Sequence, residues 1–118
     1  MPLNGGAAQR DISPRKPCPL YGYPHVERVS TGVHDPLLAS AIVLDNADQR
    51  VLVGALDILF LTPPDARRLR RLVAEAIDTA EENVFISCTH THSGPVTTRL
   101  ISWQNDPTAP PPNTEYVE

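Results

Sequence analysis

The sequence predicts an α/β fold with a mixed sheet, in which an antiparallel hairpin is followed by a βαβ unit. Apolar runs at residues 37–44 and 50–61 flank a short polar stretch, which is the pattern of two paired strands. A helical repeat then leads to a third apolar run at residues 84–88, which is the pattern of a parallel crossover. Coil-rich segments are expected on both sides of this unit.

The size of the chain suits one small domain. Its 118 residues are 41% hydrophobic and 20% charged, which is ordinary for a globular protein. The net charge of −4 argues against a nucleic-acid partner, and the four arginines between residues 67 and 71 are expected on the solvated face of a helix. No apolar run approaches the roughly 20 residues of a membrane span and no signal peptide is visible, so we expect a cytoplasmic protein. The oligomeric state stays open.

The N-terminal part is expected to be irregular. Residues 1–10 combine glycine, alanine and polar residues without a pattern, which predicts a loose lead-in. The stretch up to residue 36 is dense in proline and tyrosine, and it should cross the surface as ordered coil because proline removes backbone donors and fixes φ. The run at residues 37–44 then suits a buried strand, and the polar residues 45–49 have the length of a hairpin turn.

Asp57 interrupts the second apolar run. An ionised carboxylate in such a run is costly unless it is paired or binds something. Two roles stay open for this side chain. It either caps the amides of a nearby loop or takes a place at an active site.

A helix is predicted to begin after Thr62. This residue is a suitable cap, two prolines fit the first turn, and Asp65 suits the positive end of the helix dipole. Apolar residues recur at helical spacing as far as Ala80, so the helix should end near Glu82. The strand at residues 84–88 should then lie parallel to the preceding strand, after a right-handed crossover.

The pattern disappears beyond Pro95. Residues 104–113 contain four prolines, which predicts a loop. Residues 114–118 have the composition of the first turn of another helix. A domain rarely ends on such a signal, so we expect this chain to be the N-terminal part of something longer.

The stretch Ser87-Cys88-Thr89-His90-Thr91-His92-Ser93-Gly94-Pro95 follows the last predicted strand. Side chains i and i+2 of an extended backbone point to the same side. His90 and His92 are therefore placed to reach one metal ion, or one binds the metal while the other contacts a substrate. Neutral imidazole suits Zn²⁺, and a catalytic zinc takes about three protein ligands. Functional loops of α/β sheets lie at the carboxyl ends of strands, which favours a site here over a purely structural strand end.

Other kinds of chemistry fit the sequence less well. Cys18 and Cys88 imply no disulfide framework, and Cys88 is expected to be a small hydrophobic residue rather than a nucleophile beside His90. Ser93 lacks the Gly-x-Ser-x-Gly pattern of a nucleophilic serine hydrolase. His34 either borders the site or is held by the turn that follows it.

Several segments together carry a family resemblance. They are Asp11-Ile12-Ser13-Pro14, Gly22-Tyr23, Gly32-Val33-His34-Asp35-Pro36-Leu37, Val51-Leu52-Val53 with Asp57, and Thr89-His90-Thr91-His92-Ser93-Gly94-Pro95. In this order they resemble the N-terminal domain of neutral/alkaline non-lysosomal ceramidases, and the motif with the two histidines is the specific part. The resemblance implies that residues 1–118 form the N-terminal part of a single, larger ceramidase-like catalytic domain.

The resemblance implies a function in sphingolipid metabolism. It implies a zinc-dependent hydrolase that cleaves the amide bond of N-acylsphingosine, or of a related lipid amide, with a zinc-activated water. It also implies that His90 is a zinc ligand and that His92 is catalytic, as a hydrogen-bond donor to the developing oxyanion. His34, Asp57 and Ser93 are candidates for residues beside the site. The family's other ligands, a second His, a Glu and a Tyr, come from much later in its domain, so we expect this chain alone to be incomplete.

Two other functions stay open. One is a catalytically incomplete fragment or a non-catalytic binding module that keeps the fold but holds no metal. The other is a zinc esterase or lactonase, because nothing in the sequence separates an amide substrate from an ester. Zinc content distinguishes the first from an enzyme, and substrate preference distinguishes the second.

Overall fold

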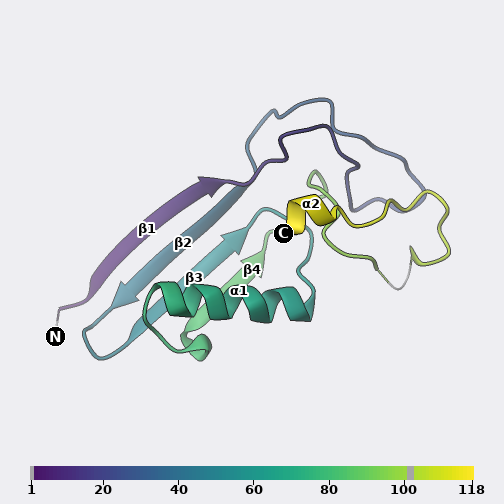
Figure 1. Ribbon diagram of the computed structural model, residues 1–118. Helices are drawn as coiled ribbons and strands as arrows, with labels where there is room; N and C mark the ends of the chain where they lie inside the picture. The colour runs from purple at the N-terminus through teal and green to yellow at the C-terminus, as the bar shows by residue number, and fades with distance from the viewer. Residues whose placement is uncertain (1, 101–102) are drawn as a thin grey trace.

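The structure is a computed structural model that describes residues 2–100 and 103–118. Its centre is a four-stranded sheet in the order β1-β2-β3-β4 (Figure 1). The strands are β1 (Asn4–Asp11), β2 (Leu38–Asp45), β3 (Arg50–Leu56) and β4 (Val84–Cys88). β2 pairs antiparallel with both β1 and β3, whereas β3 and β4 are parallel. The predicted mixed sheet, with a hairpin followed by a βαβ unit, is confirmed.

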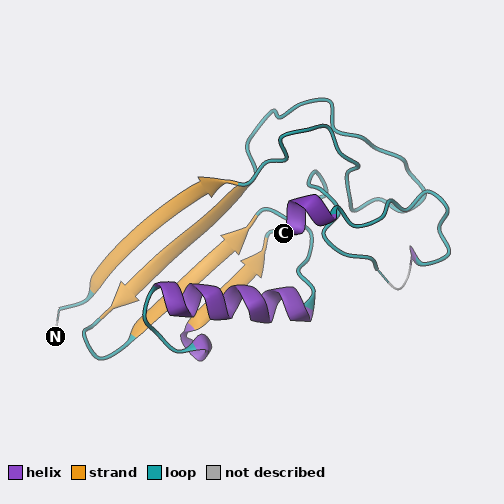
Figure 2. Ribbon diagram, viewed as in Figure 1, coloured by secondary structure: helices purple, strands orange, loops and turns teal. Residues whose placement is uncertain are grey.

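Helix α1 (Pro63–Ala76) connects β3 to β4 and lies against the sheet (Figure 2). Thr62 caps it as expected, because its hydroxyl oxygen accepts a hydrogen bond from the backbone N–H of Asp65 at 3.2 Å. Leu52 of β3, Ala74 of α1 and Val84 of β4 form the buried core between helix and sheet. The helix ends earlier than we expected, and a short 3₁₀ helix, η1 (Glu81–Asn83), leads into β4.

The sheet face opposite α1 is apolar and open. Ile42, Val53 and Phe85 lie opposite one another in register across β2, β3 and β4. Their exposed fractions are 52%, 47% and 62%. Side chains alternate between the faces of a sheet, so their neighbours Leu52 and Val84 point to the helix instead. Both faces of this sheet therefore carry apolar side chains, but only one is covered by the described residues.

The expectation of a loose lead-in at residues 1–10 is wrong. Residues 4–11 form β1, which pairs with β2 from Asn4 opposite Asp45 to Asp11 opposite Leu38, whereas Met1 lies outside the described residues. All residues of β1 are exposed. The strand is held by backbone pairing to the edge of the sheet and not by burial of its side chains. This explains why its sequence carries no apolar pattern.

The second apolar run is also not a single strand. β3 ends at Leu56. Asp57 N–H still bonds to the carbonyl of Leu38 of β2 at 2.9 Å, and the chain then leaves the sheet. The rest of the run enters a second core, where Leu59 is buried with Tyr21 and Val96. This core joins the coil segments to one another, which explains how they are ordered without strands or helices.

The C-terminal segment packs onto the same region. Residues 104–113 form loop and turns, as expected, and α2 (Thr114–Val117) follows. Asn113 N–H bonds to the carbonyl of Val96 at 2.8 Å, and the Asn113 side chain accepts from Tyr116 N–H at 3.2 Å. Within residues 2–100 and 103–118, no helix has the length and apolar character that a membrane crossing requires.

Candidate active site

The loop with the two histidines lies where the parallel strands end. Thr89 N–H bonds to the carbonyl of Leu56 at 2.9 Å, and His90 N–H bonds to the carbonyl of Ile58 at 3.1 Å. The loop that leaves β4 is thereby tied to the chain that leaves β3. These bonds place His90 and His92 at the carboxyl ends of two parallel strands, where α/β sheets commonly carry their sites.

The imidazole rings of His90 and His92 are in contact. Their centroids are 5.1 Å apart and their planes meet at 70°. His90 has a φ of +62°, a left-handed conformation that few residues other than glycine adopt. The two rings are therefore brought together by the left-handed backbone conformation of His90, and not by the extended backbone that we expected.

The surroundings of His90 suit a metal ligand. Its Nδ1 lies 3.3 Å from the carbonyl oxygen of Leu59, and its ring packs against Phe60 with centroids 4.8 Å apart. A carbonyl partner selects the tautomer in which Nδ1 donates, and this leaves the lone pair on Nε2. Histidines that bind metals usually donate their other ring N–H in this way. Nε2 of His90 is thus available as a donor atom to a metal.

A coil segment between Tyr21 and Arg28 holds His92. The rings of Tyr23 and His92 pack in a T-shaped arrangement, with centroids 5.1 Å apart and planes at 73°. The Arg28 guanidinium donates to the carbonyl of His92 at 2.5 Å and to that of Tyr21 at 3.0 Å. Gly22 passes so close that a Cβ there would lie 2.5 Å from Cγ of His92. His92 is therefore fixed at both its backbone and its ring.

Tyr23 and Arg28 were not predicted from the sequence to belong to the site. Both lie in coil, far along the chain from His92, and no periodic pattern connects them to it. One signal was available, because Gly22-Tyr23 is among the segments that carry the family resemblance. Arg28 had no such signal.

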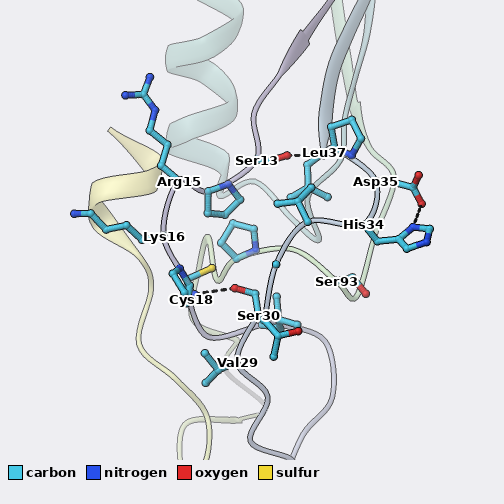
Figure 3. A pocket seen from close by; sticks show the side chains of 18 of the residues that line it. Ser13, Arg15, Lys16, Cys18, Val29, Ser30, His34, Asp35, Leu37 and Ser93 are labelled. Carbon is cyan, nitrogen blue, oxygen red and sulfur yellow. Dashed lines mark hydrogen bonds and ion pairs between the residues drawn. The ribbon is translucent and has the colours of Figure 1, made fainter.

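His34, Asp57 and Ser93 line a cavity of about 620 Å³ (Figure 3). Much of its wall comes from the coil of residues 13–18 and 29–37. Thr91 and Ser93 contribute from the loop with the two histidines, but the described lining includes neither His90 nor His92. The three residues named as neighbours of the site thus gather in one place, and this place lies beside the imidazoles instead of around them.

The contacts of these three residues differ. Asp57 accepts a hydrogen bond from Leu38 N–H at 2.8 Å, so its carboxylate caps the start of β2, which is the structural one of its two expected roles. The imidazole of His34 lies 2.7 Å from the carboxylate of Asp35, and both side chains are almost fully exposed. Ser93 is exposed as well.

The residues present fit part of a zinc site. Among the side chains that the structure describes, no group of three or more His, Cys, Asp or Glu residues is arranged to hold a metal. His90 supplies one suitable nitrogen, and His92 lies next to it. Burial raises the pKa of the Cys88 thiol, which disfavours the free thiolate that a nucleophile needs. A complete shell therefore requires groups beyond the described residues.

Comparison with known proteins identifies related molecules. No protein-family model matches the chain. Neutral ceramidase 3 from Arabidopsis thaliana is 36% identical over 96 residues, which are 76% of this chain and 13% of that protein. The crystal structure of neutral ceramidase from Pseudomonas aeruginosa superimposes with a TM-score of 0.64 at 29% identity, over 81% of this chain and 16% of that chain. By sequence and by fold, the chain is a relative of the neutral ceramidases and spans a small share of the length of each.

Proposed function

We propose that this chain forms part of a ceramidase-like hydrolase that cleaves the amide bond of N-acylsphingosine or a related lipid amide. The observation that carries the proposal is the pair of touching imidazoles at the carboxyl ends of β3 and β4. It stands in a chain that is related to neutral ceramidases over most of its own length.

Zinc is the cofactor that we propose. When bound, zinc lowers the pKa of a coordinated water toward about 7 and polarises a carbonyl group. His90 would hold it through Nε2, since Nδ1 faces the carbonyl of Leu59. A catalytic site takes about three protein ligands, so the remaining ones would come from polypeptide other than the described residues.

His92 is the proposed catalytic residue of this chain. Its role is to donate a hydrogen bond to the oxygen of the scissile carbonyl as negative charge develops there. Such a donor is worth on the order of 3 kcal/mol, provided that it is already oriented before the reaction. The contacts of Tyr23 and Arg28 with His92 supply this orientation.

The proposal is tested by measuring zinc content and hydrolysis of a fluorogenic N-acylsphingosine analogue with the whole, zinc-loaded protein. His90→Ala should lose both zinc and turnover. His92→Ala should keep zinc but lower kcat by about 100-fold, which is the rate equivalent of about 3 kcal/mol. Arg68→Ala is the control and should keep both, because its side chain is exposed on α1 and takes no part in the site. If the two site variants kept zinc and rate, the histidines would be structural.

A second candidate is a non-catalytic binding module of the same fold. It is favoured for the chain on its own, because the described residues contain no group of three potential ligands. A protein that binds the lipid amide but contains no zinc and releases no product would establish this function. Faster cleavage of a matched ester than of the amide would instead identify an esterase or lactonase.

A further inference from the structure

We propose that Arg28 and Tyr23 are positioning residues that set the orientation of the His92 ring. Arg28 acts on the backbone of His92, and Tyr23 acts on its ring. The consequence for catalysis rests on the proposed function, whereas the effect on the ring does not.

Arg28 joins three parts of the site. Its Nη2 carries two hydrogens and donates to the carbonyls of both Tyr21 and His92. Its Cζ lies 4.3 Å from the centroid of the Tyr23 ring, within the range of a cation–π contact. Among the described residues, Arg28 forms no ion pair with a carboxylate. Its guanidinium is therefore committed to the loop and to the ring that packs on His92.

Tyr23 stands at one end of a row of four rings. The row is Tyr23, His92, His90 and Phe60, with successive centroids 5.1, 5.1 and 4.8 Å apart and each ring edge-on to the next. The two imidazoles lie between the two benzene rings in this row, so each ring restricts the rotation of its neighbour. Tyr23 is 54% exposed, which is unusual for a residue whose role is to fill a core. Its contacts are instead explained by the ring that it holds.

Lysine cannot replace Arg28 in this arrangement. A guanidinium is planar, so it stacks on Tyr23 while its edge donates to two carbonyls. The lysine ammonium keeps the positive charge, but it lacks the planar group that contacts the Tyr23 ring and donates to two carbonyls at the same time. Arg28→Lys is therefore the most informative variant, because it separates geometry from charge.

The first experiment uses the 118-residue protein and does not depend on activity. Nuclear Overhauser effects between the ring protons of Tyr23 and His92 report the contact directly. Arg28→Lys should weaken these effects by at least threefold while leaving the backbone resonances of the sheet unchanged. Tyr23→Phe should retain them, because only the hydroxyl is lost. Arg68→Lys, an exposed change on α1, is the matched control. Unchanged contacts in both Arg28→Lys and Arg28→Ala would overturn the proposal.

The second experiment separates a positioning role from a structural one. In the whole, zinc-loaded protein, Arg28→Lys should lower kcat at least tenfold, with KM and zinc content within twofold of the parent. Loss of zinc together with kcat would show that Arg28 merely holds the loop together, and this would also overturn the proposal. If no lipid amide is hydrolysed at all, the proposed function fails, but the ring contacts still decide whether Arg28 and Tyr23 orient His92.

Discussion

Replacing Gly22 by alanine tests how closely the coil packs against His92. Gly22 has a φ of +115°, which L side chains rarely adopt. An added Cβ would lie 2.5 Å from Cγ and 2.6 Å from Nδ1 of His92. Both atoms belong to the imidazole, so the methyl group can be accommodated only if the coil or the ring moves.

The expected cost follows from these two effects. A strained backbone conformation costs about 1–3 kcal/mol, and forcing a methyl group into a packed site costs about 1–3 kcal/mol more. We therefore expect Gly22→Ala to lower the free energy of unfolding by about 2–6 kcal/mol. With an m-value of about 1–3 kcal/mol per molar urea, the unfolding midpoint should fall by about 1 M or more.

Urea unfolding monitored by tryptophan fluorescence measures this loss. Trp103 is the single tryptophan. Its ring centroid lies 5.3 Å from that of Tyr21, and Tyr21 directly precedes Gly22 in the chain. Gly6→Ala is the control, because nothing lies within 4 Å of a Cβ at that position and the midpoint should not fall. If Gly22→Ala unfolded at the same urea concentration as the parent, the close packing of the coil on His92 would be refuted.

Three further predictions concern stability. Leu52→Ala should lower the free energy of unfolding by about 2–5 kcal/mol, because it leaves a cavity in the core under α1. Phe85 is exposed on the other sheet face, so Phe85→Ala should lower it by about 1 kcal/mol or less. Equal losses in urea unfolding would contradict the assignment of the sheet faces. Burial raises the pKa of Tyr116 to about 12, and its hydroxyl has no hydrogen-bond partner among the described residues, so Tyr116→Phe should not lower the thermal midpoint. Hydrogen bonds from Thr108 and from His25 N–H lower the pKa of Asp106 from 3.8 to about 2. As the pH falls, Asp106 is therefore protonated in the unfolded chain before it is protonated in the folded protein, so the stability that it contributes is present above about pH 4 and is lost toward pH 2. Asp106→Asn should flatten the dependence of the thermal midpoint on pH in that range. An unchanged dependence would argue against this role of Asp106.

The elements that the sequence predicted correctly are those encoded locally. Thr62 caps α1 because a threonine before two prolines is enough to define a helix start. The strands at residues 38–45, 50–56 and 84–88 were predictable because their apolar runs reflect burial. β1 was not, because an exposed edge strand is held by backbone bonds to β2 that its own side chains do not encode.

The candidate site was predictable only in part, for a similar reason. The motif placed His90 and His92 at a strand end, and the structure brings their rings together. The left-handed φ of His90 could not be foreseen, because it accompanies bonds to the chain that leaves β3. The contacts of Tyr23 and Arg28 with His92 join residues distant in sequence. Contacts of that kind depend on the folded coil and leave no periodic pattern.

Binding of zinc by His90 is the central claim, and a zinc titration of the whole protein labelled with ¹⁵N-histidine tests it most directly. We predict that Nε2 of His90 shifts first, while its Nδ1 stays protonated toward the carbonyl of Leu59. His25 and His34, which face carboxylates instead, should respond only at higher zinc concentrations. His90→Ala should remove the first response altogether. A first response at His25 or His34, or none at Nε2 of His90, would contradict the assignment of His90 as the metal ligand.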